Sequence, residues 1–399
     1  MVHKKYMEIS ELGDAARQTK FSVNSILKHN GYQNKPLSFE QAYLLGAFTL
    51  SGYVSELQEE FDTTPEVALR QSLAALCTLH NRALYEQEGS AQQIAGICSA
   101  VFDHDIGTAS KSFVQPNVEM VMDNCGMGGD LYRTPNLSTI AALIAAADGI
   151  PMLKHGSPGN TDSTGSSDFL VHCGVDLYAS KETVESGVEK FNFGYTEALD
   201  EGYKRIHSQT HQFAKLAHMN DIIGPITNPV VPHLMRRRVI GVNHLIPPER
   251  IAEAYAIMNR AGVTAVERGF FVRGFADPAR TAGIDEVSLM GGGTLVAELY
   301  NDDVESRFIF AQDFGLHEME PEELDPGKNK AETSRRIVSG EITGGKQDAA
   351  LANAALLFHL AQGISLKEST EKSRNLIESG KPFEILQNYA EHTQGEKNG

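Results

Sequence analysis

The stretch from Val118 to Leu170 constrains the fold most, because it repeats one plan of strand, loop and helix. The first copy runs from the apolar segment Val118 to Cys125, through the loop Gly126-Met-Gly-Gly-Asp130, into an alanine-rich helix expected from Leu137. The second runs from the strand Pro151 to His155, through a loop rich in glycine and serine, into a helix expected from Phe169. Two such units in succession are typical of parallel α/β folds.

Both loops are suited to binding phosphate. Glycine lets the backbone adopt positive φ and lets N–H groups approach an anion, and a helix N-terminus adds unpaired donors. Either loop alone would be weak support, since glycine-rich turns also occur in α/β proteins that bind no phosphate. Together they predict two anion-binding turns on neighbouring strands.

The composition is that of an acidic globular protein. The chain has 399 residues, of which 41% are hydrophobic, so it can form one large domain or two unequal ones. A net charge of −17 argues against a nucleic-acid or acidic-membrane partner, because both attract basic surfaces. We see no signal peptide and no apolar stretch of about 18 residues, and therefore expect a cytoplasmic protein.

The four cysteines are Cys77, Cys98, Cys125 and Cys173. None forms a Cys-x-x-Cys pair, and all lie in apolar contexts. We predict reduced core thiols and neither disulfides nor zinc ligands.

The first hundred or so residues carry helical patterns and no strand pattern. Thr64-Pro65 is a good N-cap and first-turn pair. Two apolar stripes at helical spacing follow, formed by Leu69, Leu73, Leu76 and His80 and by Ile94, Ile97, Cys98 and Val101. We interpret both as faces on which helices pack.

After Asp168, helix and strand patterns alternate. We expect helices at Thr183–Glu189, Ile251–Ala261 and Gln347–Gln362, strands at Val239–Val242, Glu267–Arg273 and Thr294–Leu299, a rigid turn at Gly224–Pro229, and a polar loop containing Pro321 and Pro326. The basic run Arg236–Arg238 could clamp a phosphate, but a solvated strand end or a subunit contact is the favoured interpretation.

Four motifs in register resemble one family. They are Gly126-x-Gly-Gly-Asp130, Asn136-Leu-Ser-Thr139, Lys154-His-Gly156 and Ser163-Thr-Gly-Ser-Ser-Asp168. The combination resembles the anthranilate phosphoribosyltransferases. The related pyrimidine nucleoside phosphorylases have serine where this chain has Gly156, so the transferase branch fits better.

The resemblance implies an α/β fold with two domains. Residues 1–115 would form a small all-helical domain, joined in space by helices from about 180–215. Residues 116–399 would form a larger domain with a mainly parallel central sheet flanked by helices, which binds 5-phosphoribosyl 1-diphosphate (PRPP). The family pairs its helical domains in a homodimer. About 20 to 30 extra residues, between Gly52 and Ala91, form either an elaborated dimer surface or a longer helix.

The resemblance also assigns the PRPP site. The first loop, with Gly126, Gly128, Gly129 and Asp130, would contact the ribose and diphosphate; Thr134, Asn136, Leu137, Ser138 and Thr139 would bind phosphate at the helix start; Gly156, Gly159, Asn160 and Ser166 would complete the cradle. Lys154 would supply the local positive charge that an acidic protein needs for this substrate.

A magnesium site is implied at Asp285 and Glu286, together with the Ser138 hydroxyl. Mg²⁺ binds through few carboxylates plus water and substrate oxygens, so this donor set is sufficient. We expect electrostatic catalysis in which Mg²⁺ and Lys154 stabilise the leaving diphosphate, without a nucleophilic side chain. His155 could assist proton transfer, or it could only order the loop.

The acceptor half of the site departs from the family pattern. Ser157 replaces an asparagine that contacts anthranilate, and the arginine that pairs with the acceptor carboxylate aligns with His211, or with Lys204 or Arg205 in a looser alignment. Three alternatives therefore remain: an anthranilate phosphoribosyltransferase, a phosphoribosyltransferase for another aromatic or heterocyclic acceptor, and a phosphorylase-like or non-catalytic relative.

Overall fold

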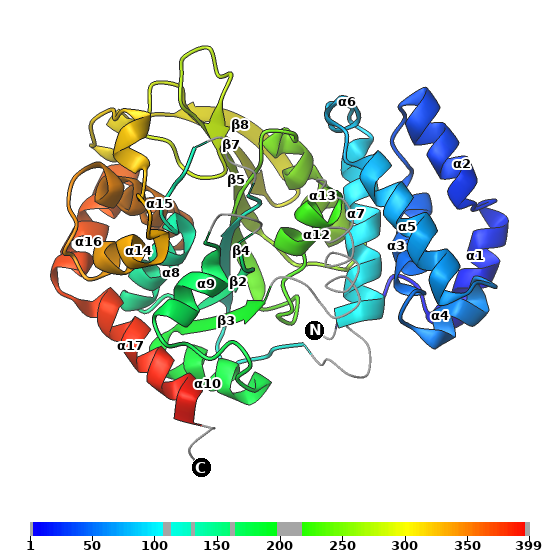
Figure 1. Cartoon of the computed structure of the whole chain (residues 1–399), viewed down its shortest axis with the longest axis horizontal. Coiled ribbons are helices and arrows are strands. Elements are labelled where there is room, and N and C mark those ends of the chain that lie inside the picture. The colour runs from blue at the N-terminus through cyan, green and yellow to red at the C-terminus, as the bar shows by residue number, and fades with distance from the viewer. Residues whose placement is uncertain (1–2, 107–112, 129–131, 160–163, 198–217, 396–399) are drawn as a thin grey trace. The chain divides into compact units, whose positions relative to one another are not determined.

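The computed structural model describes residues 3–106, 113–128, 132–159, 164–197 and 218–395 (Figure 1). The chain divides into two compact units, and the first comprises residues 1–113, 198–233 and 245–265. The second comprises residues 114–197, 234–244 and 266–399. The predicted boundary at residue 115 lies close to this division. The helix at 181–191 belongs to the second unit, however, so its predicted place in the helical domain is wrong.

The described part of the first unit is built from helices. They are α1 (Leu12–Gln18), α2 (Val23–Leu27), α3 (Phe39–Leu50), α4 (Ser55–Glu60), α5 (Pro65–Leu79), α6 (Arg82–Tyr85), α7 (Ser90–Val101), α12 (Asn220–Ile226) and α13 (Pro248–Arg260). Short 3-10 and π turns occur at Ile9–Glu11, Lys28–Tyr32 and Phe102–Ile106.

The helix signals of this unit are largely confirmed. The Thr64 side chain accepts a hydrogen bond from the N–H of Val67 and so caps α5. The second apolar stripe is buried along α7, which packs against α3, α12 and α13. His80 lies just beyond the end of α5, and the expected rigid turn from Gly224 is wrong at its start, because α12 extends through Ile226.

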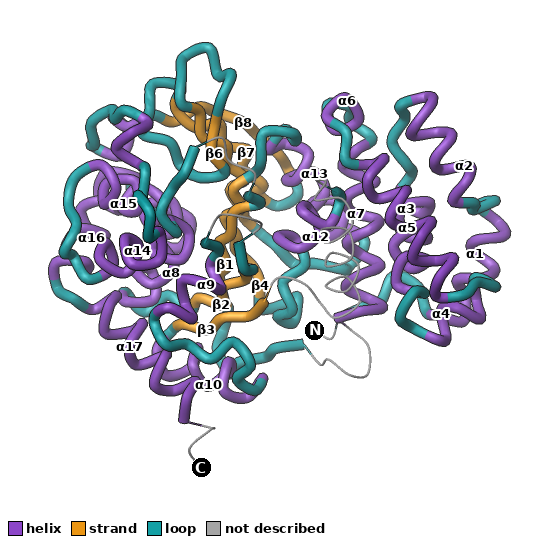
Figure 2. Tube along the Cα trace, viewed as in Figure 1, coloured by secondary structure: helices purple, strands orange, loops and turns teal. Residues whose placement is uncertain are grey.

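The second unit contains one mixed sheet (Figure 2). Its strands are β1 (Val121–Gly126), β2 (Met152–Gly156), β3 (Phe193–Glu197), β4 (Met235–Gly241), β5 (Arg268–Phe275), β6 (Gly283–Ile284), β7 (Gly293–Tyr300) and β8 (Asp303–Ile309). The order is β3-β2-β1-β4-β5-β7-β8, with β6 paired to β5. Neighbours from β3 to β5 are parallel, whereas β6, β7 and β8 add antiparallel pairs. The α/β fold class is confirmed.

The second unit also contains helices, and several of them pack against this sheet. They are α8 (Leu137–Ala147), α9 (Ser166–His172), α10 (Lys181–Phe191), α14 (Lys330–Val338), α15 (Gly345–Gln362), α16 (Leu366–Glu378) and α17 (Lys381–Gln394), with 3-10 turns at Ala311–Phe314 and Pro321–Leu324. The alanine-rich helices α8 and α15 pack against each other and share a core with Met122, Met152 and Phe270 of the strands. Small side chains allow this close packing.

Several elements differ from the expected ones. The helix after the second loop begins at Ser166 and not at Phe169. The region predicted as a polar loop after Leu299 begins with β8. The helix α15 ends at Gln362, as predicted, and Gly363 follows it in the left-handed conformation. The four cysteines are free, and Cys98 and Cys125 are buried, which confirms that part of the prediction.

Within the described residues, no single helix has both the length and the apolar character needed to cross a membrane; α15 and α16 reach them only as a pair bent by 115°.

Candidate active site

The predicted acidic turn lies over the ends of two neighbouring strands. Gly126 at the end of β1 and Gly241 at the end of β4 are register partners. A Cβ at Gly126 would come within 2.2 Å of the Asp285 carboxylate, and one at Gly241 within 1.5 Å of the Asp285 backbone oxygen. Glycine at both positions therefore creates the space in which Asp285 sits. Gly241 was missed by the sequence analysis, because only the strand pairing brings it to this turn.

The first glycine-rich loop is bonded to the same turn. Gly128 has a φ of +76° and donates its N–H to Asp285 Oδ2 at 2.5 Å. An L side chain rarely adopts this φ, so the loop conformation requires glycine. Asp285 is thus held by the loop that the sequence assigns to PRPP, across 157 positions of the chain.

Ser138, at the start of α8, connects the acidic turn to Lys154. Its N–H donates to Glu286 Oε1 at 3.2 Å, and its hydroxyl accepts from Lys154 Nζ at 3.3 Å. Lys154 Nζ also donates to the backbone oxygen of Asn124 at 2.7 Å, while the Asn124 amide donates to the Ser138 carbonyl at 2.8 Å. The three predicted metal residues and the predicted cationic residue therefore meet in one cluster.

Burial shifts the pKa values of the charged groups in this cluster. It lowers the pKa of Lys154, which is fully buried. Burial is the main cause that raises the pKa of Glu286 to about 8, and repulsion from the neighbouring Asp285 carboxylate is the second. A cation between the two carboxylates would offset both effects on Glu286.

These residues fit a magnesium ion. Carboxylate and hydroxyl oxygens are the hard donors that Mg²⁺ binds, and the two glycines leave room for the acidic turn. Across the part of the chain that the structure describes, no three His, Cys, Asp or Glu residues gather as a metal site.

The second loop and α9 form the other side of the cradle. Asp168 accepts from the N–H groups of Gly159 at 2.7 Å and Gly165 at 2.8 Å, which closes the loop on itself. Thr139 Oγ1 donates to Ser166 Oγ at 3.1 Å and so links the starts of α8 and α9. The two predicted anion-binding turns therefore lie side by side.

Other predicted residues are placed as follows. Asn136 donates to the Thr164 carbonyl at 3.2 Å, and its amide oxygen accepts from Ser334 of α14 at 3.0 Å. Thr134 is buried, and the side chain of Leu137 lies wholly in the core. Gly129, Asp130, Asn160, Lys204, Arg205 and His211 lie outside the described residues.

A buried ion pair beneath the site was not predicted. Arg238 bonds to Asp123, and their side chains are only 1% and 0% exposed. The favoured interpretation of Arg238 as part of a solvated strand end is therefore wrong, since β4 already starts at Met235. Asp123 also accepts the N–H of His155 at 2.9 Å, while His155 Nδ1 lies 3.1 Å from Thr196 Oγ1.

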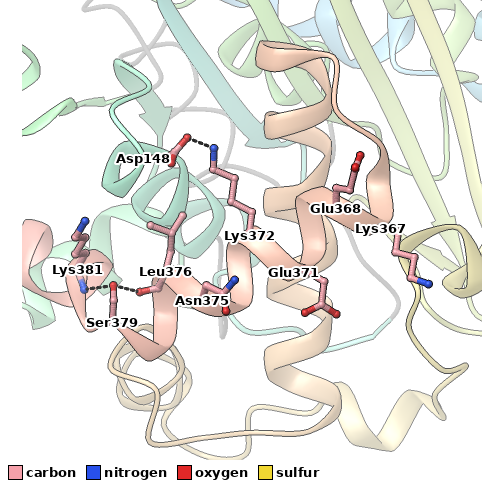
Figure 3. A pocket seen from close by; sticks show the side chains of 9 residues that line it. All are labelled: Asp148, Lys367, Glu368, Glu371, Lys372, Asn375, Leu376, Ser379 and Lys381. Carbon is pink, nitrogen blue, oxygen red and sulfur yellow. Dashed lines mark hydrogen bonds and ion pairs between the residues drawn. The ribbon is translucent and has the colours of Figure 1, made fainter.

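A surface pocket in the second unit lies away from this cluster (Figure 3). Asp148, which follows the last residue of α8, lines it together with Lys367, Glu368, Glu371, Lys372, Asn375, Leu376, Ser379 and Lys381. Ser138 lies at the opposite end of α8, and a helix of 11 residues spans about 16 Å. Lys372 is already paired with Asp148 at 2.5 Å, so we do not assign the substrate to this pocket.

The chain resembles known proteins along most of its length. Residues 118–383 match a family model described as "Glycosyl transferase family, a/b domain". An anthranilate phosphoribosyltransferase of Haloarcula marismortui is 33% identical over 325 residues, which cover 80% of this chain and 89% of the relative. One of Shewanella denitrificans is 31% identical, covering 70% and 74% respectively.

Solved structures support the same fold. The anthranilate phosphoribosyltransferase of Thermus thermophilus superimposes with a TM-score of 0.69 at 24% identity, covering 98% of this chain and all 100% of that one. The Saccharomyces cerevisiae enzyme in complex with PRPP and Mg gives a TM-score of 0.69 at 21% identity, covering 98% and 99%.

Proposed function

Because the chain belongs to the anthranilate phosphoribosyltransferase family, we propose that it transfers the phosphoribosyl group of PRPP to the amine of anthranilate and releases diphosphate, a step of tryptophan biosynthesis. The observation that carries the proposal is the cluster in which Ser138 joins Lys154 to the acidic turn Asp285-Glu286. It supplies cationic and metal-binding groups beside two anion-binding loops, which is what a substrate with a phosphate and a diphosphate requires.

The residues of the cluster have separable roles. Lys154 would bind diphosphate oxygens and stabilise the charge that grows on them as the bond to the ribose breaks. Asp285, Glu286 and Ser138 would hold Mg²⁺. When bound there, the ion would neutralise charge on the departing diphosphate. The amine of anthranilate is uncharged at neutral pH, so no strong base and no nucleophilic side chain are needed.

An acceptor panel tests the proposed reaction. With PRPP and Mg²⁺, we expect anthranilate consumption, followed by its fluorescence, and one diphosphate released for each anthranilate consumed. Chelation of Mg²⁺ should stop both signals. Two results would contradict the proposal. One is a ribose product that forms only when inorganic phosphate is supplied, and the other is no release of diphosphate with any acceptor.

A different acceptor is the second candidate. Ser157 occupies the position at which the resemblance expects an asparagine contacting anthranilate, and a hydroxyl offers fewer donors than an amide. The panel should therefore include other aromatic and heterocyclic amines. Faster diphosphate release with one of these than with anthranilate would favour this candidate and leave the assignment of the PRPP site unchanged.

We also propose a homodimer formed through helices of the first unit, on the basis of the family resemblance. Light scattering at micromolar protein concentration should give twice the 43.5 kDa mass of the chain. A strictly monomeric mass would count against it. The cytoplasmic location stays a prediction.

A further inference from the structure

One acidic residue at the edge of the sheet, Glu197, has no role in the PRPP and magnesium sites described above. Glu197 is the last residue of β3, the edge strand beside β2. It is the register partner of Gly156, while Tyr195 is the partner of Lys154. Register partners on parallel strands point to the same face, and residues two apart on one strand do so too. Glu197 therefore shares a face with Lys154 and the starts of α8 and α9.

The carboxylate of Glu197 is held by one buried hydroxyl group, which a second buried hydroxyl group supports in turn. Ser167 Oγ donates to Glu197 Oε1 at 2.5 Å and lies 2.7 Å from the hydroxyl oxygen of Tyr195. Ser167 has a single proton to give, so Tyr195 is the donor in the second bond. Burial raises the pKa of Tyr195 well above its usual value, which keeps this donor protonated. Ser167 and Tyr195 are 1% and 5% exposed, whereas Glu197 is half-buried.

This cluster is bonded to the position that departs from the family pattern. The N–H of Ser167 donates to the backbone oxygen of Ser157 at 3.2 Å. A Cβ at Gly156 would lie 2.7 Å from the Tyr195 hydroxyl, so Tyr195 packs directly on the turn after His155. Glu197 is thus connected through one residue to Ser157, where the acceptor is expected.

The charge of Glu197 selects what it can bind. A carboxylate accepts hydrogen bonds and donates none, and it repels phosphate. An aromatic amine offers two N–H donors and no charge at neutral pH. Because a carboxylate can accept several hydrogen bonds at once, one held by Ser167 can also accept from a ligand.

We propose that Glu197, held by Ser167 and Tyr195, is a specificity-determining residue that accepts a hydrogen bond from the amino group of the acceptor. The inference rests on the proposed transferase function and narrows the acceptor to an aromatic or heterocyclic compound with an N–H group. It also disfavours inorganic phosphate as the acceptor. The carboxylate orients the amine. Because Glu197 makes this polar contact, the amine keeps one even though Ser157 stands where an asparagine is expected.

A comparison of anthranilate with benzoate, which lacks the amine, tests the inference. Their dissociation constants are measured by calorimetry on protein saturated with Mg²⁺ and diphosphate, so that no turnover occurs. We expect Glu197→Gln to weaken anthranilate binding about tenfold or more, the range for a hydrogen bond to a charged group. Benzoate should bind about equally well, because it has no amino group that donates to Glu197. Diphosphate affinity should change less than about twofold, within the scatter of a surface substitution.

Two further variants complete the test. Glu182→Gln removes the same charge from an exposed position of α10 and should change none of the three affinities. Ser167→Ala removes the hydroxyl that holds Glu197 and should weaken anthranilate but not benzoate; it also tests the idea if Glu197→Gln does not fold.

Equal weakening of anthranilate and benzoate, or no effect on either, would overturn the inference, as would a matching loss of diphosphate affinity. If wild-type protein binds diphosphate but no amine of the panel, the proposed acceptor and the inference both fail. If it turns over anthranilate and Glu197→Gln shows no selectivity, the inference alone fails.

Discussion

Replacing Asp285 and Glu286 together by alanine should lower transferase turnover on the order of 10³-fold or more, because metal and oxyanion contacts each contribute several kcal/mol at a developing negative charge. The melting temperature should change little. The double substitution removes the hydrogen bonds from Gly128 and Ser138, but it also removes two adjacent carboxylates whose burial and repulsion raise the pKa of Glu286. These opposing effects are each modest for a chain of this size.

The matched control is the double substitution of Glu322 and Glu323, two adjacent exposed acids in the same unit. It removes the same charge and should leave turnover and Mg²⁺ dependence unchanged. Calorimetry of Mg²⁺ binding in the presence of diphosphate separates a metal-binding role of Asp285 and Glu286 from a structural role, and it requires no turnover. A large stability loss in the Asp285 and Glu286 variant, with metal binding retained, would show that the acidic turn is structural.

The local parts of the fold and site could be predicted from the sequence. The two glycine-rich loops and the start of α8 are encoded within about 50 residues of each other, by glycine, capping and hydrophobic periodicity. The helix ends at Thr64 and Gly363 follow from the same local rules. The acidic pair could be assigned only through the family resemblance, because two adjacent acids in a turn are ordinary by themselves.

The remaining parts depend on which strands become neighbours. Gly241 matters because β4 pairs with β1 and brings it under Asp285. Glu197 matters because β3 pairs with β2 beside Gly156. The assignment of α13 to the helical unit and of α10 to the sheet unit depends on tertiary packing, which helical periodicity does not specify.

The ion pair of Asp123 and Arg238 leaves a signal in the sequence. Asp123 is the only charged residue of the buried strand β1, and Arg238 directly precedes the apolar end of β4; a buried charge in such a place requires a partner. The two are register partners on β1 and β4. A basic run at a strand boundary is usually solvated, and that general tendency gave the wrong interpretation.

Breaking this pair should produce the largest stability loss among our predictions. Asp123→Asn leaves the Arg238 guanidinium buried without its counter-ion. Arg238→Met leaves the Asp123 carboxylate buried without the Arg238 guanidinium. Removing one partner of a buried pair costs about 3–5 kcal/mol, which corresponds to a fall in melting temperature of roughly 5 °C for a chain of this length. Scanning calorimetry of both single variants and of the double variant measures the effect.

The double variant Asp123→Asn with Arg238→Met should be more stable than either single variant, because neither charge is then buried without a partner. Arg336→Met, in the half-exposed pair with Glu341, is the control and should cost no more than about 1 kcal/mol. Asp123 also accepts the N–H of His155, and Arg238 orients the Asp123 side chain that makes this bond. Because both single variants disturb that orientation, they should lose PRPP affinity as well as stability. If the stability losses of the two single variants add up in the double variant, the two residues act independently. The ion pair then does not fix the ends of β1 and β2 beneath Lys154.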